Sequence, residues 1–304
     1  MPNCNEKIFL ENDWILAEIL PWDGGRISRI YDKKHDCELI WSNPRTKNVS
    51  RYYGCNYDDL SASGIEEAFP TVQPCKAGGA DVPFFGEIWT IPWEYKKHGE
   101  GYIFTCSSPI WTAEIRKKVF LFENSLSMTY EIRNTGKEMF EFLFGFHPSL
   151  CIYESSRLYA PGGIYEMYVA GQLEEGKTEQ FTWPYYGERD MSDACAKENT
   201  GFFNFLTFPV ADGCYGVEHP SKETGLKIEF DRRFFKCLSL WPIYGGWRGH
   251  TCVMTEAFTT WPVSLDKAIE EDRAYRLKPS ECAETTVNYT VGMENREGAL
   301  CRNM

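Results

Sequence analysis

Two ionisable residues, His147 and Glu256, lie in apolar segments where their side chains could exchange protons with a ligand. His147 follows the run MFEFLFGF, which is typical of a strand buried on both faces. Pro148 favours an extended backbone at His147 and lacks an N–H, so we expect the strand to end there. An imidazole at the rim of a core can accept or donate a proton near neutral pH. The alternative is a structural histidine bonded to a backbone carbonyl.

Glu256 lies in a predicted strand from 251 to 258, on the more apolar of its two faces. The residues of that face are Cys252, Met254, Glu256 and Phe258. A carboxylate there must be paired, hydrogen-bonded or lining a cavity, because burying an isolated charge is costly. In a cavity it could act as a general base. Neutralisation by an arginine, or a strand end that faces solvent, explains the pattern equally well.

Further residues could bind a sugar, whose ring faces stack on aromatic side chains and whose hydroxyls need hydrogen-bond partners. These candidates are Glu66, Glu67, Glu87, Trp89 and Trp241. Glu87 and Trp89 belong to PFFGEIWTIPW, and Trp241 precedes PIYGG. Tryptophan and tyrosine are equally common as core fillers in β sandwiches, so composition does not separate the two interpretations.

Strand signals dominate the elements that must position these residues. Apolar and polar residues alternate without a break between Ser125 and Arg133, and turn residues follow. Other strands are expected at 26–31, 110–122, 226–231, 236–241, 251–258 and 285–291. One helix is expected from Ser264, as its N-cap, to about Tyr275. The pattern predicts an all-β chain, an antiparallel sandwich or barrel, with one domain over residues 1–304.

Composition excludes several classes of function. The chain has 304 residues, 43% of them hydrophobic, and a net charge of −12, which disfavours nucleic acid and anionic membrane surfaces as partners. The sequence contains no run of eighteen apolar residues, the length that could span a membrane, and we find no signal-peptide pattern. The twelve cysteines are spread singly and are expected to be reduced, buried thiols. We therefore expect a cytoplasmic protein, and one without a metal site, because no HxH or HxxxH pair occurs.

Five segments, in their order and spacing, resemble the aldose 1-epimerase (galactose mutarotase-like) superfamily. LPWDGGRISRIYDKKHDCELIW resembles its opening hairpin, and SGIEEAFPTVQPC with PFFGEIWTIPW resembles its substrate-facing loops. FGFHPSL is similar to its His-Pro segment, and TEAFTTWPVSLDKA to the segment that carries its catalytic glutamate. LKPSECAETTVNYTVG resembles its closing strand. The resemblance covers nearly the whole chain.

This resemblance implies a large antiparallel β sandwich with an open cleft. It also implies interconversion of the α and β anomers of a free aldose, with the sugar as the partner and no cofactor. Glu256 would remove the proton from the anomeric hydroxyl, and His147 would protonate the ring oxygen. The ring would then open and reclose on the other face.

The sequence departs from the family pattern in two places. Phe85 stands where many members have a second histidine, and Ser280 stands where glycine is usual. The arginine that often contacts the substrate has three candidates, Arg26, Arg51 and Arg248. Two alternatives therefore stay open, a sugar-binding protein without turnover and a phosphosugar epimerase. A glycoside hydrolase is a third, because paired carboxylates suit that chemistry.

Overall fold

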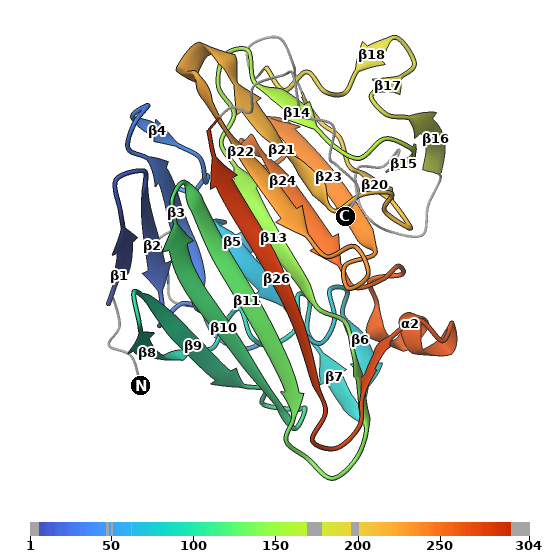
Figure 1. The fold of residues 1–304 in the computed structure, drawn as a ribbon. Helices are drawn as coiled ribbons and strands as arrows, with labels where there is room; N and C mark the ends of the chain where they lie inside the picture. The colour runs from blue at the N-terminus through green and yellow to red at the C-terminus, as the bar shows by residue number, and fades with distance from the viewer. Residues whose placement is uncertain are drawn as a thin grey trace.

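Two large antiparallel sheets pack face to face in the computed structural model of the chain (Figure 1). The structure describes residues 6–46, 49, 51–61, 63–168, 178–195 and 201–292. This architecture confirms the large antiparallel β sandwich that the alternating sequence pattern and the family resemblance predicted.

The larger sheet has fourteen strands in the order β1-β2-β3-β5-β13-β24-β23-β20-β15-β16-β17-β18, with β4 beside β3 and β19 beside β23. Their bounds are β1 (Ile8–Glu11), β2 (Ile15–Leu20), β3 (Arg26–Asp32), β4 (Cys37–Glu38), β5 (Ile65–Ala68), β13 (Gly145–Leu150), β15 (Ile164–Tyr168), β16 (Thr178–Thr182), β17 (Tyr185–Tyr186), β18 (Arg189–Asp190), β19 (Gly201–Phe202), β20 (Phe205–Thr207), β23 (Cys237–Tyr244) and β24 (Thr251–Phe258). Strands β5, β13, β24 and β23 lie next to one another in the middle of this order.

The smaller sheet has eight strands in the order β14-β21-β22-β26-β11-β10-β9-β8. Their bounds are β8 (Glu94–His98), β9 (Gly101–Ser107), β10 (Ala113–Phe122), β11 (Ser125–Asn134), β14 (Arg157–Tyr159), β21 (Cys214–His219), β22 (Thr224–Phe230) and β26 (Cys282–Val291). The remaining elements are the pairs β6 (Cys75–Ala77) with β7 (Ala80–Val82) and β12 (Phe140–Phe142) with β25 (Tyr275–Leu277), the helices α1 (Tyr57–Leu60) and α2 (Leu265–Glu270), and a 3₁₀ turn, Pro220–Lys222.

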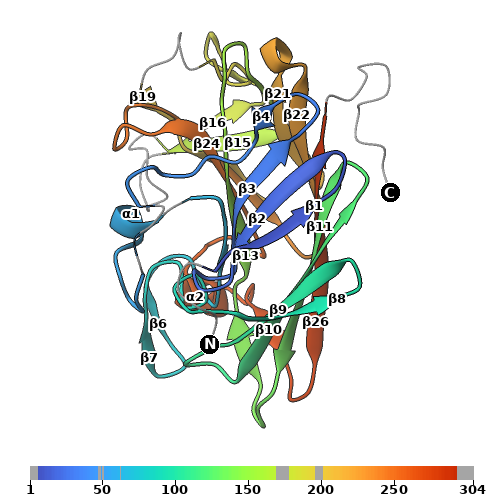
Figure 2. The ribbon, with the colours of Figure 1, turned by 90° about the vertical axis from the view of Figure 1, so that its left-hand side faces the viewer.

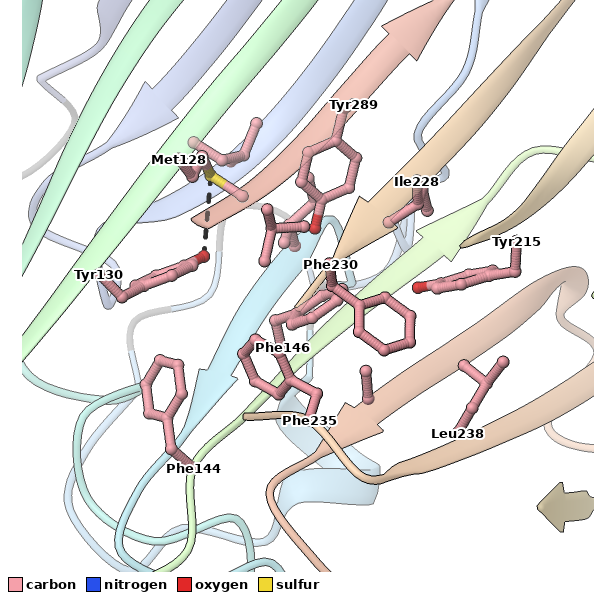
Figure 3. Packing of buried hydrophobic residues seen from close by; sticks show 14 of the residues in the cluster. Met128, Tyr130, Phe144, Phe146, Tyr215, Ile228, Phe230, Phe235, Leu238 and Tyr289 are labelled. Atoms are coloured by element: carbon pink, nitrogen blue, oxygen red, sulfur yellow. Dashed lines mark hydrogen bonds between the residues drawn. The ribbon is translucent and has the colours of Figure 1, made fainter. Parts of the chain in front are cut away.

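The core lies between the inner faces of the two sheets (Figure 3). Phe146 of β13 packs on Phe235 and on Tyr289 of β26, with ring centroids 5.0 and 6.4 Å apart. Tyr130 of β11 packs on Phe144 at 5.1 Å. Burial of such large apolar surfaces is the main stabilising contribution to a sandwich of this kind. The opposite, outer face of the larger sheet is partly covered by a second buried cluster, which includes Tyr57, Phe85 and Phe258. Figure 2 shows α1 on that outer side, away from β11 and β26.

The segment Met139–Leu150 belongs to two different sheets, which corrects the prediction of one continuous strand. β12 pairs with β25 in a small sheet, and β13 enters the larger sheet. β13 also continues through Pro148 rather than ending at His147. The proline is tolerated because the pairing of β13 with β24 is interrupted between Phe146 and Ser149, where a missing N–H costs little.

The predicted helix from Ser264 to about Tyr275 is also too long. α2 ends at Glu270, and Tyr275 already begins β25. Ser264 occupies the N-cap position, but its hydroxyl donates to the Asp266 carboxylate instead of accepting from a backbone N–H. The expected start of the helix is thus correct, whereas the expected capping bond is absent.

Candidate active site

Neighbouring strands of the larger sheet bring His147 and Glu256 to its outer face. Phe146 pairs with Ala257, and both belong to the core between the sheets. Because side chains alternate along a strand, the next residue of β13 and the preceding residue of β24 point the other way. Glu66 of β5 is the register partner of His147 and shares its face. This register confirms the predicted face of Glu256 on β24.

The two side chains contact each other directly. His147 Nε2 lies 3.0 Å from Glu256 Oε1, and the side chains are 1% and 10% exposed. The second oxygen, Glu256 Oε2, is buried and has no hydrogen-bond partner within the described part of the chain. A proton donor and a proton acceptor therefore lie side by side in a largely desolvated site.

The other imidazole nitrogen is held by Tyr57 of α1. The Tyr57 hydroxyl donates to Glu66 Oε2 at 2.9 Å and lies 3.3 Å from His147 Nδ1. Ser61 Oγ donates to the same carboxylate oxygen at 3.0 Å. Because the single phenolic proton goes to Glu66, the phenolic oxygen accepts from Nδ1–H. Nε2 is then the nitrogen that faces Glu256.

This environment favours the protonated imidazole. Burial by itself lowers the pKa of His147, but the hydrogen bond that His147 donates to Glu256 and the charges of Glu256 and Glu66 outweigh it. The pKa of His147 is therefore raised above its ordinary value of 6.5. A group of this kind can donate a proton near neutral pH.

A buried ion network lies behind Glu66. Arg51 NH1 lies 2.8 Å from Glu66 Oε1 and 3.4 Å from Asp23 Oδ1, and the Arg51 guanidinium rests over the ring of Trp89 at 5.1 Å. Arg26 NH2 pairs with Asp23 Oδ2 at 2.7 Å. Arg51, Arg26, Glu66 and Trp89 were all predicted to contact a substrate. In the structure the charges of Arg26 and Arg51 are compensated by Asp23 and Glu66, and Trp89 packs under Arg51.

A cavity of about 530 Å³ opens beside Glu256, and His147 lies behind this residue rather than in the cavity wall. Glu256, Tyr57, Trp241, Trp247 and Asn204 contribute to its wall. The Trp241 indole N–H has no hydrogen-bond partner among the residues described. A concave site with aromatic walls and a few unsatisfied polar groups suits a small polar ligand with apolar ring faces.

Phe85 makes the site less polar than a second histidine would. Its ring packs on Tyr57 with centroids 4.4 Å apart and meets His147 edge-on at 5.4 Å. Phe85 is 1% exposed and has a φ of +64°, a backbone conformation unusual for a bulky residue. It therefore buttresses Tyr57 and His147 without supplying a proton.

Glu67 and Glu87, also expected to bind a substrate, lie elsewhere in the structure. Glu67 alternates with Glu66, so it points inward, and its Oε1 lies 2.7 Å from Lys117 Nζ between the sheets. Glu87 accepts from the backbone N–H of Ile110 at 3.0 Å and from Ser108. Neither lines the cavity, and we propose no binding role for them.

Arg248 lies at the rim of the cavity. Its NH1 lies 2.6 Å from Asp59 Oδ1, and its guanidinium rests over Trp247 at 5.2 Å from the ring centroid. Trp247 and the neighbouring Asp58 line the cavity. The rim arginine is thus already neutralised by an acidic residue.

Sequence reasoning missed Tyr57, and only a weak signal marks it. Asn56 caps α1 by accepting from the backbone N–H of Asp59 at 3.0 Å, which fixes Tyr57 as the first helical residue. An asparagine followed by acidic residues predicts a helix start, but nothing local predicts a partner 90 residues away.

Within the part of the chain that the structure describes, no helix is long and apolar enough to cross a membrane. In the same residues, no group of three or more His, Cys, Asp or Glu side chains is placed to hold a metal ion.

Comparisons with solved structures give the class of protein that this fold defines. The Slr1438 protein from Synechocystis sp. PCC 6803 superposes with a TM-score of 0.74 and 17% identity, over 96% of this chain and 98% of that one. A protein of Escherichia coli K12, named provisionally as an aldose 1-epimerase, gives 0.72 and 14%, over 95% and 99%. A galactose mutarotase-like protein from Lactobacillus casei ATCC 334 gives 0.67 and 14%, over 94% and 100%.

The chain therefore has the galactose mutarotase-like fold, at low sequence identity to these structures. No protein-family model and no curated protein matches the sequence.

Proposed function

We propose that this protein interconverts the α and β anomers of an aldose, with Glu256 as base and His147 as acid. The observation that carries the proposal is the 3.0 Å contact between His147 Nε2 and Glu256 Oε1 beside an aromatic-walled cavity. The anomeric oxygen O1 and the ring oxygen O5 are bound to the same carbon. An acid and a base only a few ångströms apart can therefore serve both.

The reaction needs no group beyond these two. Glu256 takes the proton from O1–H, and the released electron pair forms the C1=O1 double bond. The C1–O5 bond breaks, and O5 takes the proton of His147 Nε2. Rotation about C1–C2 and closure on the other face, with both transfers reversed, give the second anomer and regenerate the pair.

The electrostatics favour an uncharged sugar over a phosphosugar. Arg26, Arg51 and Arg248, the cations expected to contact a substrate, are each paired with a carboxylate. Binding a phosphate to any of these arginines would require breaking its ion pair. The pairs of Arg26 and Arg51 are buried, which makes breaking them costly. The phosphosugar alternative therefore receives no support from these three residues.

The proposal extends to a single domain over residues 1–304 and to a cytoplasmic location. All ten described cysteines are free thiols, and seven of them are buried. Unpaired cysteines in this number suit a reducing compartment.

Polarimetry of freshly dissolved α-glucose and α-galactose, followed by a wider panel of aldoses, tests the function. We expect the wild-type protein to accelerate mutarotation and Glu256→Gln to lower the rate by at least about 100-fold, the usual contribution of a general base. Glu284→Gln, at an exposed position of β26, is the matched control and should keep the wild-type rate. A Glu256→Gln protein as active as the wild type would refute the mechanism.

A non-catalytic sugar-binding protein is the second candidate, because the ring of Phe85 occupies the place of the family's second histidine. Calorimetry separates the two. Saturable sugar binding with mutarotation no faster than in buffer would favour binding alone.

A further inference from the structure

A second cavity, of about 490 Å³, lies on the same outer face of the larger sheet, over β2 and β3. Glu18 and Leu20 of β2 line it, and they alternate with Ala17 and Ile19, which belong to the core between the sheets. Arg26 of β3 also lines it. The cavity and the His147–Glu256 pair therefore share one face of one sheet.

A row of aromatic rings connects the two cavities. Trp41, which lines the second cavity, packs on His250 with centroids 4.8 Å apart. His250 packs on Trp247 at 5.1 Å, and Trp247 packs on Trp241 at 4.8 Å. Trp247 and Trp241 line the first cavity. His250 is only 5% exposed, whereas Trp41, Trp247 and Trp241 are partly exposed. The three tryptophans, packed on one another or on His250, are thus the members of the row suited to stacking successive sugar rings.

The second cavity suits an uncharged ligand with hydroxyl groups. Its ionic side chains pair with acidic or basic partners, as Lys7 does with Glu18 at 2.9 Å and Arg26 with Asp23 at 2.7 Å. Trp22 lines the cavity, and its buried indole N–H has no hydrogen-bond partner among the described residues. A buried donor without an acceptor is costly, and a ligand oxygen would remove that cost.

From this geometry we infer that the substrate is the reducing end of a neutral oligosaccharide. The reducing ring occupies the cavity beside Glu256, and the following rings cross the aromatic row so that one of them reaches Trp22 in the second cavity. This assignment of the substrate class rests on the proposed function for the position of the reducing end.

The test compares glucose with reducing gluco-oligosaccharides of two to four units, in α-1,4 and β-1,4 linkage. Polarimetry gives kcat/KM, and calorimetry with Glu256→Gln gives affinity without turnover. In at least one linkage series we expect kcat/KM and affinity to rise with length. Trp22→Phe should remove about five- to tenfold of that gain, the range of one hydrogen bond, and leave glucose unaffected. Trp14→Phe, at an exposed tryptophan, is the matched control and should change neither.

Equal kcat/KM and affinity for glucose and for every oligosaccharide would overturn the inference. A length-dependent gain that survives both Trp22→Phe and Trp22→Ala would do the same, because the second cavity would then make no contribution. Failure of the proposed function looks different, since no sugar would mutarotate faster than in buffer. The calorimetric comparison would then still decide whether the second cavity binds a sugar ring.

Discussion

The Tyr57 hydroxyl connects His147, the proposed acid, to the buried carboxylate of Glu66. A single substitution can remove this hydroxyl. Tyr57→Phe deletes the oxygen that accepts from His147 Nδ1 and the proton donated to Glu66. We expect kcat to fall about tenfold, as for the loss of one hydrogen bond to a charged group, with KM nearly unchanged. Steady-state polarimetry measures both constants.

If Tyr57 positions His147, its loss should change the pKa of His147 as well as the rate. The pKa of His147 should fall in Tyr57→Phe, because the hydroxyl stabilises the protonated ring, and an NMR titration of the imidazole would show it. Tyr53→Phe, at a 43% exposed tyrosine, is the control. Wild-type kcat and an unchanged imidazole titration in Tyr57→Phe would leave the hydroxyl without this role.

The charge state of His147 also determines how activity depends on pH. Burial lowers its pKa, and Glu256 and then Glu66 raise it further than burial lowers it. The folded-state pKa lies above 6.5, so the acid is protonated below that pKa and is lost as pH rises through it. We expect kcat/KM to decline on the alkaline side, with a midpoint above 6.5.

An NMR titration of His147 also tests whether Glu256 is the group that raises its pKa. Glu256→Gln removes the negative partner, so the imidazole should titrate at lower pH in that variant, as NMR would show. A titration unchanged by Glu256→Gln would mean that another group raises the pKa of His147.

At the scale of elements, β5 places one glutamate on each face of the larger sheet. Glu66 joins the site, whereas Glu67 forms a buried ion pair with Lys117 of β10 and accepts from the Tyr130 hydroxyl at 2.8 Å. Burial raises the pKa of Glu67, and Lys117 and Tyr130 oppose that rise. This pair connects the two sheets and takes no part in the proposed chemistry.

Lys117→Met should lower the free energy of unfolding by about 3–5 kcal/mol, because it leaves Glu67 buried without its counter-charge. The double variant Glu67→Gln, Lys117→Met should recover most of that loss, since glutamine is neutral and still accepts from Tyr130. Urea denaturation of the wild type, both single variants and the double variant measures the coupling. Additive losses in the double variant would contradict a specific ion pair.

The turn before β26 explains why glycine is usual at position 280. Ser280 has a φ of +67°, a left-handed conformation that costs a non-glycine residue about 1–2 kcal/mol. Ser280→Gly relieves this strain but adds freedom to the unfolded chain, so we expect a net gain of roughly 0.5–1 kcal/mol in the free energy of unfolding. Ser127→Gly, inside β11, is the control and should lose stability in urea denaturation. A loss of stability in both variants would contradict the assigned strain.

Period-two alternation made most of the sandwich predictable. The predicted strand at 251–258 coincides with β24, and the one at 125–133 differs from β11 by one residue. The same periodicity placed Glu256 on the correct face. It could not tell whether Glu66 or Glu67 points outward, because both neighbours are apolar and either parity satisfies the pattern. That choice depends on pairing with β13, a contact about 80 positions away that local sequence does not encode.

At the scale of the whole molecule, the larger sheet uses its two faces differently. The inner face packs on the second sheet, and the outer face carries both cavities and the aromatic row between them. The chain as a whole carries a net charge of −12. An anionic substrate would therefore approach a negatively charged protein whose nearby arginines are already paired.

These charges predict that the protein prefers a free aldose to its phosphate ester, and that a higher salt concentration weakens this preference. We expect kcat/KM for an aldose 6-phosphate to be roughly two- to tenfold lower than for the free aldose at about 0.01 M salt. The difference should shrink at about 0.1 M, where the Debye length falls from about 30 Å to about 10 Å. Polarimetry of glucose and glucose 6-phosphate at both salt concentrations measures it. A phosphosugar that reacts faster, together with inhibition by millimolar phosphate, would instead show that the paired arginines open to bind a phosphate group, and the protein would be a phosphosugar epimerase.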